Sequence, residues 1–105
     1  MSEVKVLTSD TYGAETGSGA VVVDFYADWC GPCKMMAPTF HAAAEEFDGK
    51  IKFCKINIDE NREAAIANSV ASIPTLIFYK DGKVADRVSG VMDGATLAAK
   101  LNAIL

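Results

Sequence analysis

Two cysteines, Cys30 and Cys33, stand three positions apart directly after an apolar run, and Pro32 lies between them. The run, residues 21–27, has the composition of a strand, whereas a proline at this place is typical of the first turn of a helix. Thiols spaced in this way on a helical turn can close into a disulfide with little backbone movement. When reduced, they lie beside unpaired N–H groups and the positive end of the helix dipole, which favour a thiolate. The spacing therefore predicts a dithiol for thiol–disulfide exchange.

A purely structural role for the pair is the first alternative. A disulfide across so short a loop removes little entropy from the unfolded chain, so it would stabilise the fold poorly. A zinc site is the second alternative, and it needs two further ligands, for which Cys54 and His41 remain. Cys54 falls in a strand-like run and His41 in the helix expected to begin at Pro32, so they do not form the usual second ligand pair. For His41 we expect a position at the surface or in support of another residue, and not a role as a ligand.

Length, composition and charge limit the possible classes of function. The chain has 105 residues, half of them hydrophobic, which suffices for one domain over residues 1–105 without stabilising disulfides. Its formal net charge of −4 argues against nucleic acid or an anionic membrane as a partner. Residues 1–5 lack a basic segment followed by a long apolar run, and no apolar stretch has the length of a membrane span, so we expect neither a secretory signal nor a membrane segment. The expected location is the reducing cytoplasm.

Periodicity and turn residues predict an α/β fold, with a central mixed sheet covered by helices on both faces. Strands are expected at about residues 4–8, 21–27, 52–58, 75–79 and 83–88. Helices are expected at about residues 10–15, 32–48 and 60–68 and after residue 93. The expected helix N-caps are Ser9 or Asp10, Asp59, and Asp93. The dipeptide Asp81-Gly82 predicts a hairpin between the last two strands.

With the cysteine pair at a strand-to-helix junction, the sequence resembles the thioredoxin family over essentially its whole length. The resemblance depends on separated motifs in one order: residues 24–34 (DFYADWCGPCK), 55–59 (KINID), 73–75 (IPT), 80–82 (KDG) and Gly90. It implies the thioredoxin fold, a five-stranded mixed sheet flanked by four helices. Gly31 and Pro32, which would tune the redox properties of the cysteine pair, are similar to the residues at these positions in the reducing members. Relatives that act as oxidants or isomerases usually carry His before the second cysteine.

The resemblance implies a protein-disulfide reductase that serves cell redox homeostasis and donates electrons to reductive enzymes. Cys30, the earlier thiol and the one expected to be more exposed, attacks a target disulfide, and Cys33 resolves the mixed disulfide. The implied partners are disulfide-containing target proteins and a flavin-containing thioredoxin reductase. We expect a monomer that needs no cofactor and no metal, because the electrons reside on the two sulfurs. The alternatives are an oxidant or isomerase, and a non-catalytic scaffold subunit that uses the same surface groove.

Asp24 is the second residue with unusual chemistry, because it interrupts the apolar sequence Val-Val-Val-Asp-Phe. An ionised, unpaired carboxylate inside a doubly covered strand costs several kcal/mol of desolvation, so burial should raise its pKa. The pattern alone leaves open a strand-end aspartate that reaches water. The resemblance implies that Asp24 relays the proton to and from the Cys33 thiol. It also implies that Lys55 lies near Asp24 and tunes the acidity of its carboxyl group. Tyr26 stands where many bacterial members have tryptophan.

The resemblance also implies a shallow apolar groove that binds the target protein. Trp29 flanks the cysteine pair at the surface, and the Ile73–Pro74 bond is cis and faces it. The Ile73 backbone is then free to bind an extended target segment by strand addition. Gly90 and Val91 are expected to form the other wall. Residues 71–72 lie in a stretch that varies within the family and influences which partners fit.

Overall fold

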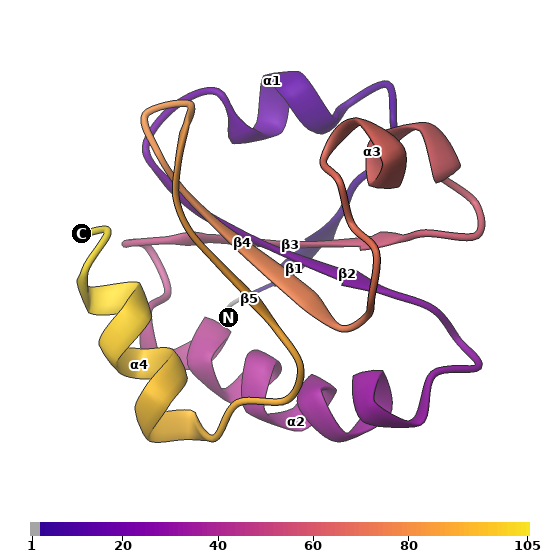
Figure 1. Cartoon of the computed structure of the whole chain (residues 1–105). Coiled ribbons are helices and arrows are strands. Elements are labelled where there is room, and N and C mark those ends of the chain that lie inside the picture. Colours follow the sequence, from indigo (N-terminus) through magenta and orange to yellow (C-terminus); the bar gives the residue numbers. More distant parts are fainter. Residues whose placement is uncertain (1–2) are drawn as a thin grey trace.

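Residues 3–105 are described by the computed structural model, which has one five-stranded sheet with strand order β1-β3-β2-β4-β5 (Figure 1). The strands are β1 (Val4–Val6), β2 (Ala20–Tyr26), β3 (Lys52–Asn57), β4 (Thr75–Lys80) and β5 (Lys83–Ser89). The helices are α1 (Tyr12–Thr16), α2 (Gly31–Glu46), α3 (Arg62–Ala67) and α4 (Gly94–Asn102). Strands β1, β3 and β2 are parallel, whereas β4 is antiparallel to both β2 and β5. The predicted mixed sheet with four helices is thereby confirmed. Met1 and Ser2, part of the stretch expected to lack a secretory signal, lie outside the described residues.

The helices form a layer on each face of the sheet, α1 and α3 on one side and α2 and α4 on the other (Figure 1). Strand β2 lies at the centre of the sheet and is buried on both faces. Its side chains alternate, so Val22 packs in the core beneath α2 and α4, while Val21 and Val23 pack beneath α1 and α3. By the same alternation Asp24 lies on the α2 side.

The expected N-caps of α1 and α3 are wrong, and Ser9 and Asp59 form other hydrogen bonds. Helix α1 follows Thr11 and not Ser9 or Asp10. The hydroxyl of Ser9 instead accepts the N–H of Ala64, in the first turn of α3, at 3.2 Å. Helix α3 begins after Asn61, whose side chain accepts the N–H of Ser9 at 2.9 Å. Two segments far apart in the sequence are thereby joined at the start of α3.

Asp59, the other expected cap of α3, is bonded to the indole of Trp29. The expected cap of α4 is confirmed, because the Asp93 carboxylate accepts the N–H of Thr96 at 2.8 Å.

The hairpin between β4 and β5 turns at the predicted dipeptide. Asp81 and Gly82 have φ angles of 50° and 83°, both in the left-handed region that a two-residue hairpin requires. The Asp81 carboxylate accepts the N–H of Gly19 at 2.9 Å. A Cβ atom at Gly82 would lie 2.9 Å from the carbonyl oxygen of Gly17, so a larger residue does not fit there.

Candidate active site

The cysteine pair lies at the amino-terminal end of α2, where Cys30 and Cys33 form a disulfide with their Cα atoms 5.2 Å apart. Cys30 is the N-cap residue and Cys33 lies in the first turn. The backbone N–H of Cys33 donates a hydrogen bond to the Cys30 sulfur, at 3.2 Å. After reduction, this bond and the positive end of the helix dipole favour a thiolate at position 30. The helix start therefore favours Cys30 as the nucleophile.

The two cysteines are equally buried, so the expectation that Cys30 is the more exposed is wrong. Cys30 is 4% exposed and Cys33 is 5% exposed. They differ in the space that they face. Cys30 lines a surface groove of about 440 Å³, whereas Cys33 lines a separate pocket of about 190 Å³ that also contains Asp24. Cys30 is therefore open to the surface groove, and Cys33 faces the buried acid.

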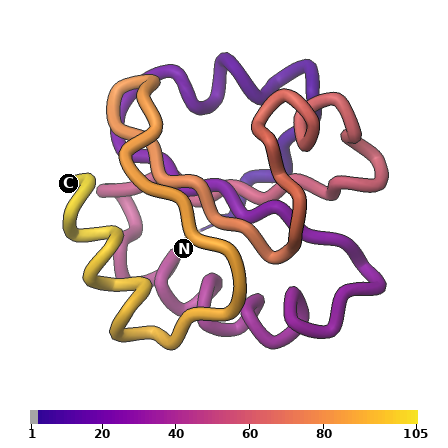
Figure 2. Tube along the Cα trace, viewed as in Figure 1, coloured from indigo at the N-terminus to yellow at the C-terminus, as the bar shows by residue number. Residues whose placement is uncertain are grey.

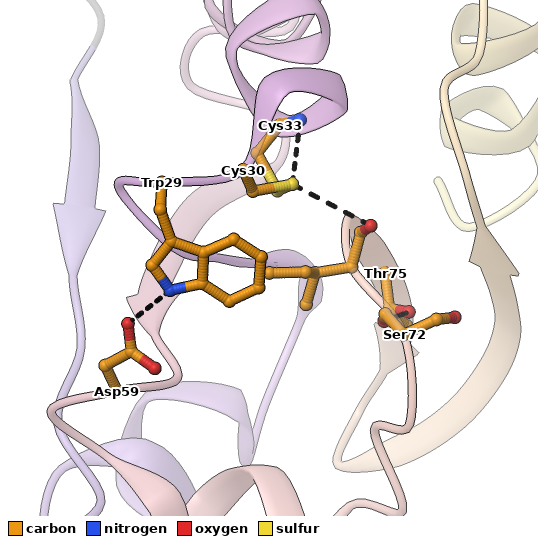
Figure 3. The surroundings of a disulfide bond; sticks show 7 residues. Trp29, Cys30, Cys33, Asp59, Ser72 and Thr75 are labelled. Atoms are coloured by element: carbon orange, nitrogen blue, oxygen red, sulfur yellow. Dashed lines mark hydrogen bonds between the residues drawn. A yellow bond between two sulfur atoms is a disulfide. The ribbon is translucent and has the colours of Figure 1, made fainter.

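Trp29 forms one side of the surface groove and is largely exposed, with 68% of its surface accessible. Its indole N–H donates to the Asp59 carboxylate at 2.7 Å, as Figure 3 shows. This bond holds the ring beside the disulfide. The groove is lined by Trp29, Cys30, Gly31, Pro32, Ile58, Val70, Ala71, Ser72 and Ile73.

The turn that precedes β4 forms the opposite side of the groove and lies near the start of α2 in the Cα trace (Figure 2). The Cys30 sulfur lies 3.9 Å from the carbonyl oxygen of Ile73, and the Ile73–Pro74 bond is cis, as predicted. The Thr75 hydroxyl donates to the carbonyl oxygen of Ser72 at 2.6 Å, which holds this turn in place (Figure 3). The backbone of Ile73 is therefore presented next to the reactive sulfur.

Ile58 and Val70 complete the apolar wall of the groove, and sequence reasoning missed both. A local signal was present, since Ile58 is the last apolar residue of a predicted strand and Val70 is an apolar residue two positions after a predicted helix. Gly90 and Val91, expected to form a wall, are not among the described residues that line the groove. The N–H of Gly90 donates to the carbonyl oxygen of Pro74 at 2.8 Å, and Val91 is exposed.

Asp24 is only 5% exposed, which excludes the alternative of a strand-end aspartate that reaches water. Burial raises the pKa of Asp24 to about 7, and the positive charge of Lys55, its neighbour in the β2–β3 register, acts in the opposite direction. The predicted rise in pKa is confirmed. The Lys55 ammonium lies 5.6 Å from the centre of the Tyr26 ring, so the aromatic residue helps to position it. A carboxyl that titrates near neutral pH can exchange a proton with Cys33 across their shared pocket.

Comparison with known proteins decides the family. Residues 3–103 match the family model for thioredoxin. The chain belongs to the thioredoxin family. Thioredoxins of Staphylococcus epidermidis and Staphylococcus aureus are 45% and 43% identical to it over 102 residues, which cover 97% of each chain. Thioredoxin of Pseudomonas aeruginosa is 47% identical over 85 residues, 81% of this chain and 79% of its own. The protein is accordingly a thiol–disulfide oxidoreductase.

The residues considered for a zinc site lie on different faces of this thioredoxin sheet. Cys54 packs in the core beneath α1 and α3, whereas His41 lies on α2 on the other face. Within residues 3–105, no group of three or more His, Cys, Asp or Glu side chains is placed to hold a metal ion. Also within this range, no helix has both the length and the apolar character needed to span a membrane.

Cys54 is a third thiol that should not take part in thioredoxin chemistry. It is fully buried, and burial raises its pKa to about 11. In the folded, reduced protein we expect Cys54 to be alkylated at least about a hundredfold more slowly than a thiol with the ordinary pKa of about 8.5. Iodoacetamide labelling followed by peptide mass spectrometry measures this, with the same reaction in denaturant as the control. Labelling of Cys54 as fast as Cys30 would contradict the prediction.

Proposed function

We propose that the protein reduces disulfide bonds of other proteins, with Cys30 as the attacking and Cys33 as the resolving thiol. The Cys30 thiolate attacks one sulfur of the target, forms a mixed disulfide and releases the other target sulfur as a thiolate. The Asp24 carboxylate accepts the proton of Cys33, whose sulfur then attacks Cys30 and displaces the second target sulfur. Two electrons pass from the dithiol to the target. The observation that carries this proposal is that Cys30 lines the surface groove, whereas Cys33 shares its pocket with Asp24.

An extended segment of the target would bind between Trp29 and Ile73. The position of the Ile73 carbonyl, 3.9 Å from the Cys30 sulfur, supports strand addition at this point. Apolar side chains of the target would contact Ile58 and Val70 in the groove. Gly90 and Val91 would act only on targets that extend beyond the groove.

The oxidised protein would be reduced again by a thioredoxin reductase, and the whole cycle would take place in the cytoplasm. The names of the staphylococcal relatives, which match over 97% of this chain, support the choice of reductase. A reducing compartment suits a disulfide that must open in every cycle. We propose that the chain acts as a single domain and a monomer, and that it supplies electrons to several reductive enzymes.

A coupled assay tests the proposal. The protein is incubated with insulin as the model protein disulfide, NADPH and a thioredoxin reductase. We expect NADPH oxidation at a rate proportional to the amount of protein, over many turnovers. The double variant Cys30→Ser/Cys33→Ser should show only the background rate. Undiminished turnover in the double variant would contradict the proposal. If the double variant lacks turnover but still changes the activity of a partner protein, the scaffold alternative is favoured.

A further inference from the structure

The pocket behind Cys33 is lined by both buried and exposed groups. Asp24 and Cys33 line its buried part, and His41, which is exposed on α2 as expected, lines it as well. His41 is the single histidine of the chain. It lies two helical turns after Cys33, so the same face of α2 carries the resolving thiol and the imidazole.

Asp24 needs a route by which protons reach and leave it. In the proposed cycle it takes one proton from Cys33 and must release that proton before the next cycle. The residue is almost completely buried, and its Oδ1 atom has no hydrogen-bond partner among the residues that the structure describes. The pocket of about 190 Å³ offers space for several water molecules, since one water occupies roughly 30 Å³ in the liquid. Water in a pocket with polar walls can carry a proton along it.

His41 is the lining group best suited to exchange this proton with solvent. Besides Asp24 and Cys33, the titratable groups that line the pocket are Tyr26, Asp28, Lys34, His41 and Lys55. Burial raises the pKa of Tyr26, so its phenol keeps the proton near neutral pH. As a class, lysine ammonium groups keep their proton and exposed carboxylates remain ionised at that pH, whereas an imidazole can both accept and release one.

We propose that His41 is the proton-exchange group at the mouth of this pocket and passes to solvent the proton that Asp24 takes from Cys33. The proposal rests on the role given to Asp24 in the proposed function. The proton leaves the Cys33 thiol for the Asp24 carboxylate, crosses the pocket to the neutral imidazole, and leaves the imidazolium for solvent. The displaced target thiolate takes up a proton from solvent, so the cycle is balanced. His41 does not contact the reacting sulfurs and acts through Asp24.

The variant His41→Gln tests this with Ellman's reagent as the disulfide. The reduced protein releases a first coloured thiolate when Cys30 attacks and a second when Cys33 resolves the mixed disulfide. At about pH 6 most Asp24 carboxyls must lose a proton before they can accept one, whereas at about pH 8 most are already ionised. We expect the first release to be unchanged. The second release should be roughly tenfold slower at about pH 6 and nearly normal at about pH 8. The expected effect at about pH 6 is smaller than the roughly 10²–10⁴-fold loss of rate on removing a direct acid–base group, because His41 acts through Asp24.

Buffer rescue separates proton exchange from a structural effect. Imidazole added at constant ionic strength should restore the second release in His41→Gln and leave the parent protein unchanged. Glu45→Gln, an exposed site one turn further along α2 and outside the pocket lining, is the matched control and should behave like the parent. The proposal is overturned if His41→Gln shows no defect at about pH 6, or a defect that imidazole does not relieve.

The outcome for Asp24→Asn distinguishes this inference from the proposed function. If Asp24→Asn slows the second release and His41→Gln does not, the relay by Asp24 stands and the inference about His41 alone fails. If Asp24→Asn leaves the second release unchanged at about pH 8, the relay itself fails and the inference about His41 falls with it.

Discussion

Replacing Cys33 with serine is expected to stop the reaction after its first step and leave the target protein covalently attached to Cys30. The Cys30 thiolate can still attack, because the first turn of α2 and its N–H groups are unchanged. A serine hydroxyl cannot displace the target from the mixed disulfide, so turnover should fall by at least roughly 10³-fold, as for loss of a covalent nucleophile. Non-reducing electrophoresis and mass spectrometry of the adduct measure the trapped complex.

Two companion variants locate the attachment point. Cys30→Ser should abolish both turnover and adduct, because Cys33 faces the inner pocket and a target cannot reach it through the groove. Cys54→Ala should retain turnover, because its thiol is buried on the opposite face of the sheet. Turnover by Cys33→Ser would show that Cys33 is not the required resolving thiol. An adduct with Cys33 in the Cys30→Ser variant would reverse the assigned order of attack.

The parts of the site that the sequence predicts correctly are those decided within a short stretch of chain. A proline in the first turn of a helix and a run of valines are local signals, and they predict the cysteine pair at the junction of β2 and α2. The burial of Asp24 follows from its apolar neighbours on a strand that is covered on both faces. These features needed no knowledge of distant contacts.

The parts that sequence reasoning missed depend on contacts between distant segments. Ser9 and Asp59 both have the residue type of an N-cap, yet Ser9 bonds to Ala64, 55 positions away, and Asp59 bonds to Trp29, 30 positions away. The equal burial of the two cysteines likewise results from the turn that brings Ile73 against Cys30. Local propensity ranks possible partners, but tertiary packing decides which of them form.

Replacing Asp24 with asparagine is expected to stabilise the fold above neutral pH. Between the ordinary pKa of 3.8 and the folded value of about 7, the unfolded chain loses the proton of this carboxyl while the folded chain keeps it, so the parent's stability falls as pH rises. Above about pH 7 the ionised carboxylate of Asp24 lowers the free energy of unfolding of the parent by on the order of 4 kcal/mol. The neutral amide of Asp24→Asn avoids this loss of stability, although its own buried polar atoms make the net stabilisation smaller.

Urea unfolding of the oxidised proteins at about pH 5 and about pH 8 measures the gain, which should be larger at the higher pH. Asp48→Asn makes the same chemical change at an exposed site and should alter stability by no more than about 0.5 kcal/mol at either pH. Because the amide cannot accept a proton from Cys33, the stabilised variant should also resolve mixed disulfides more slowly, by roughly 10²-fold or more. A lower free energy of unfolding than the parent at about pH 8 would mean that position 24 does not hold a buried acid. A stabilised variant with normal resolution would separate burial from catalysis and leave Cys33 to lose its proton by another route.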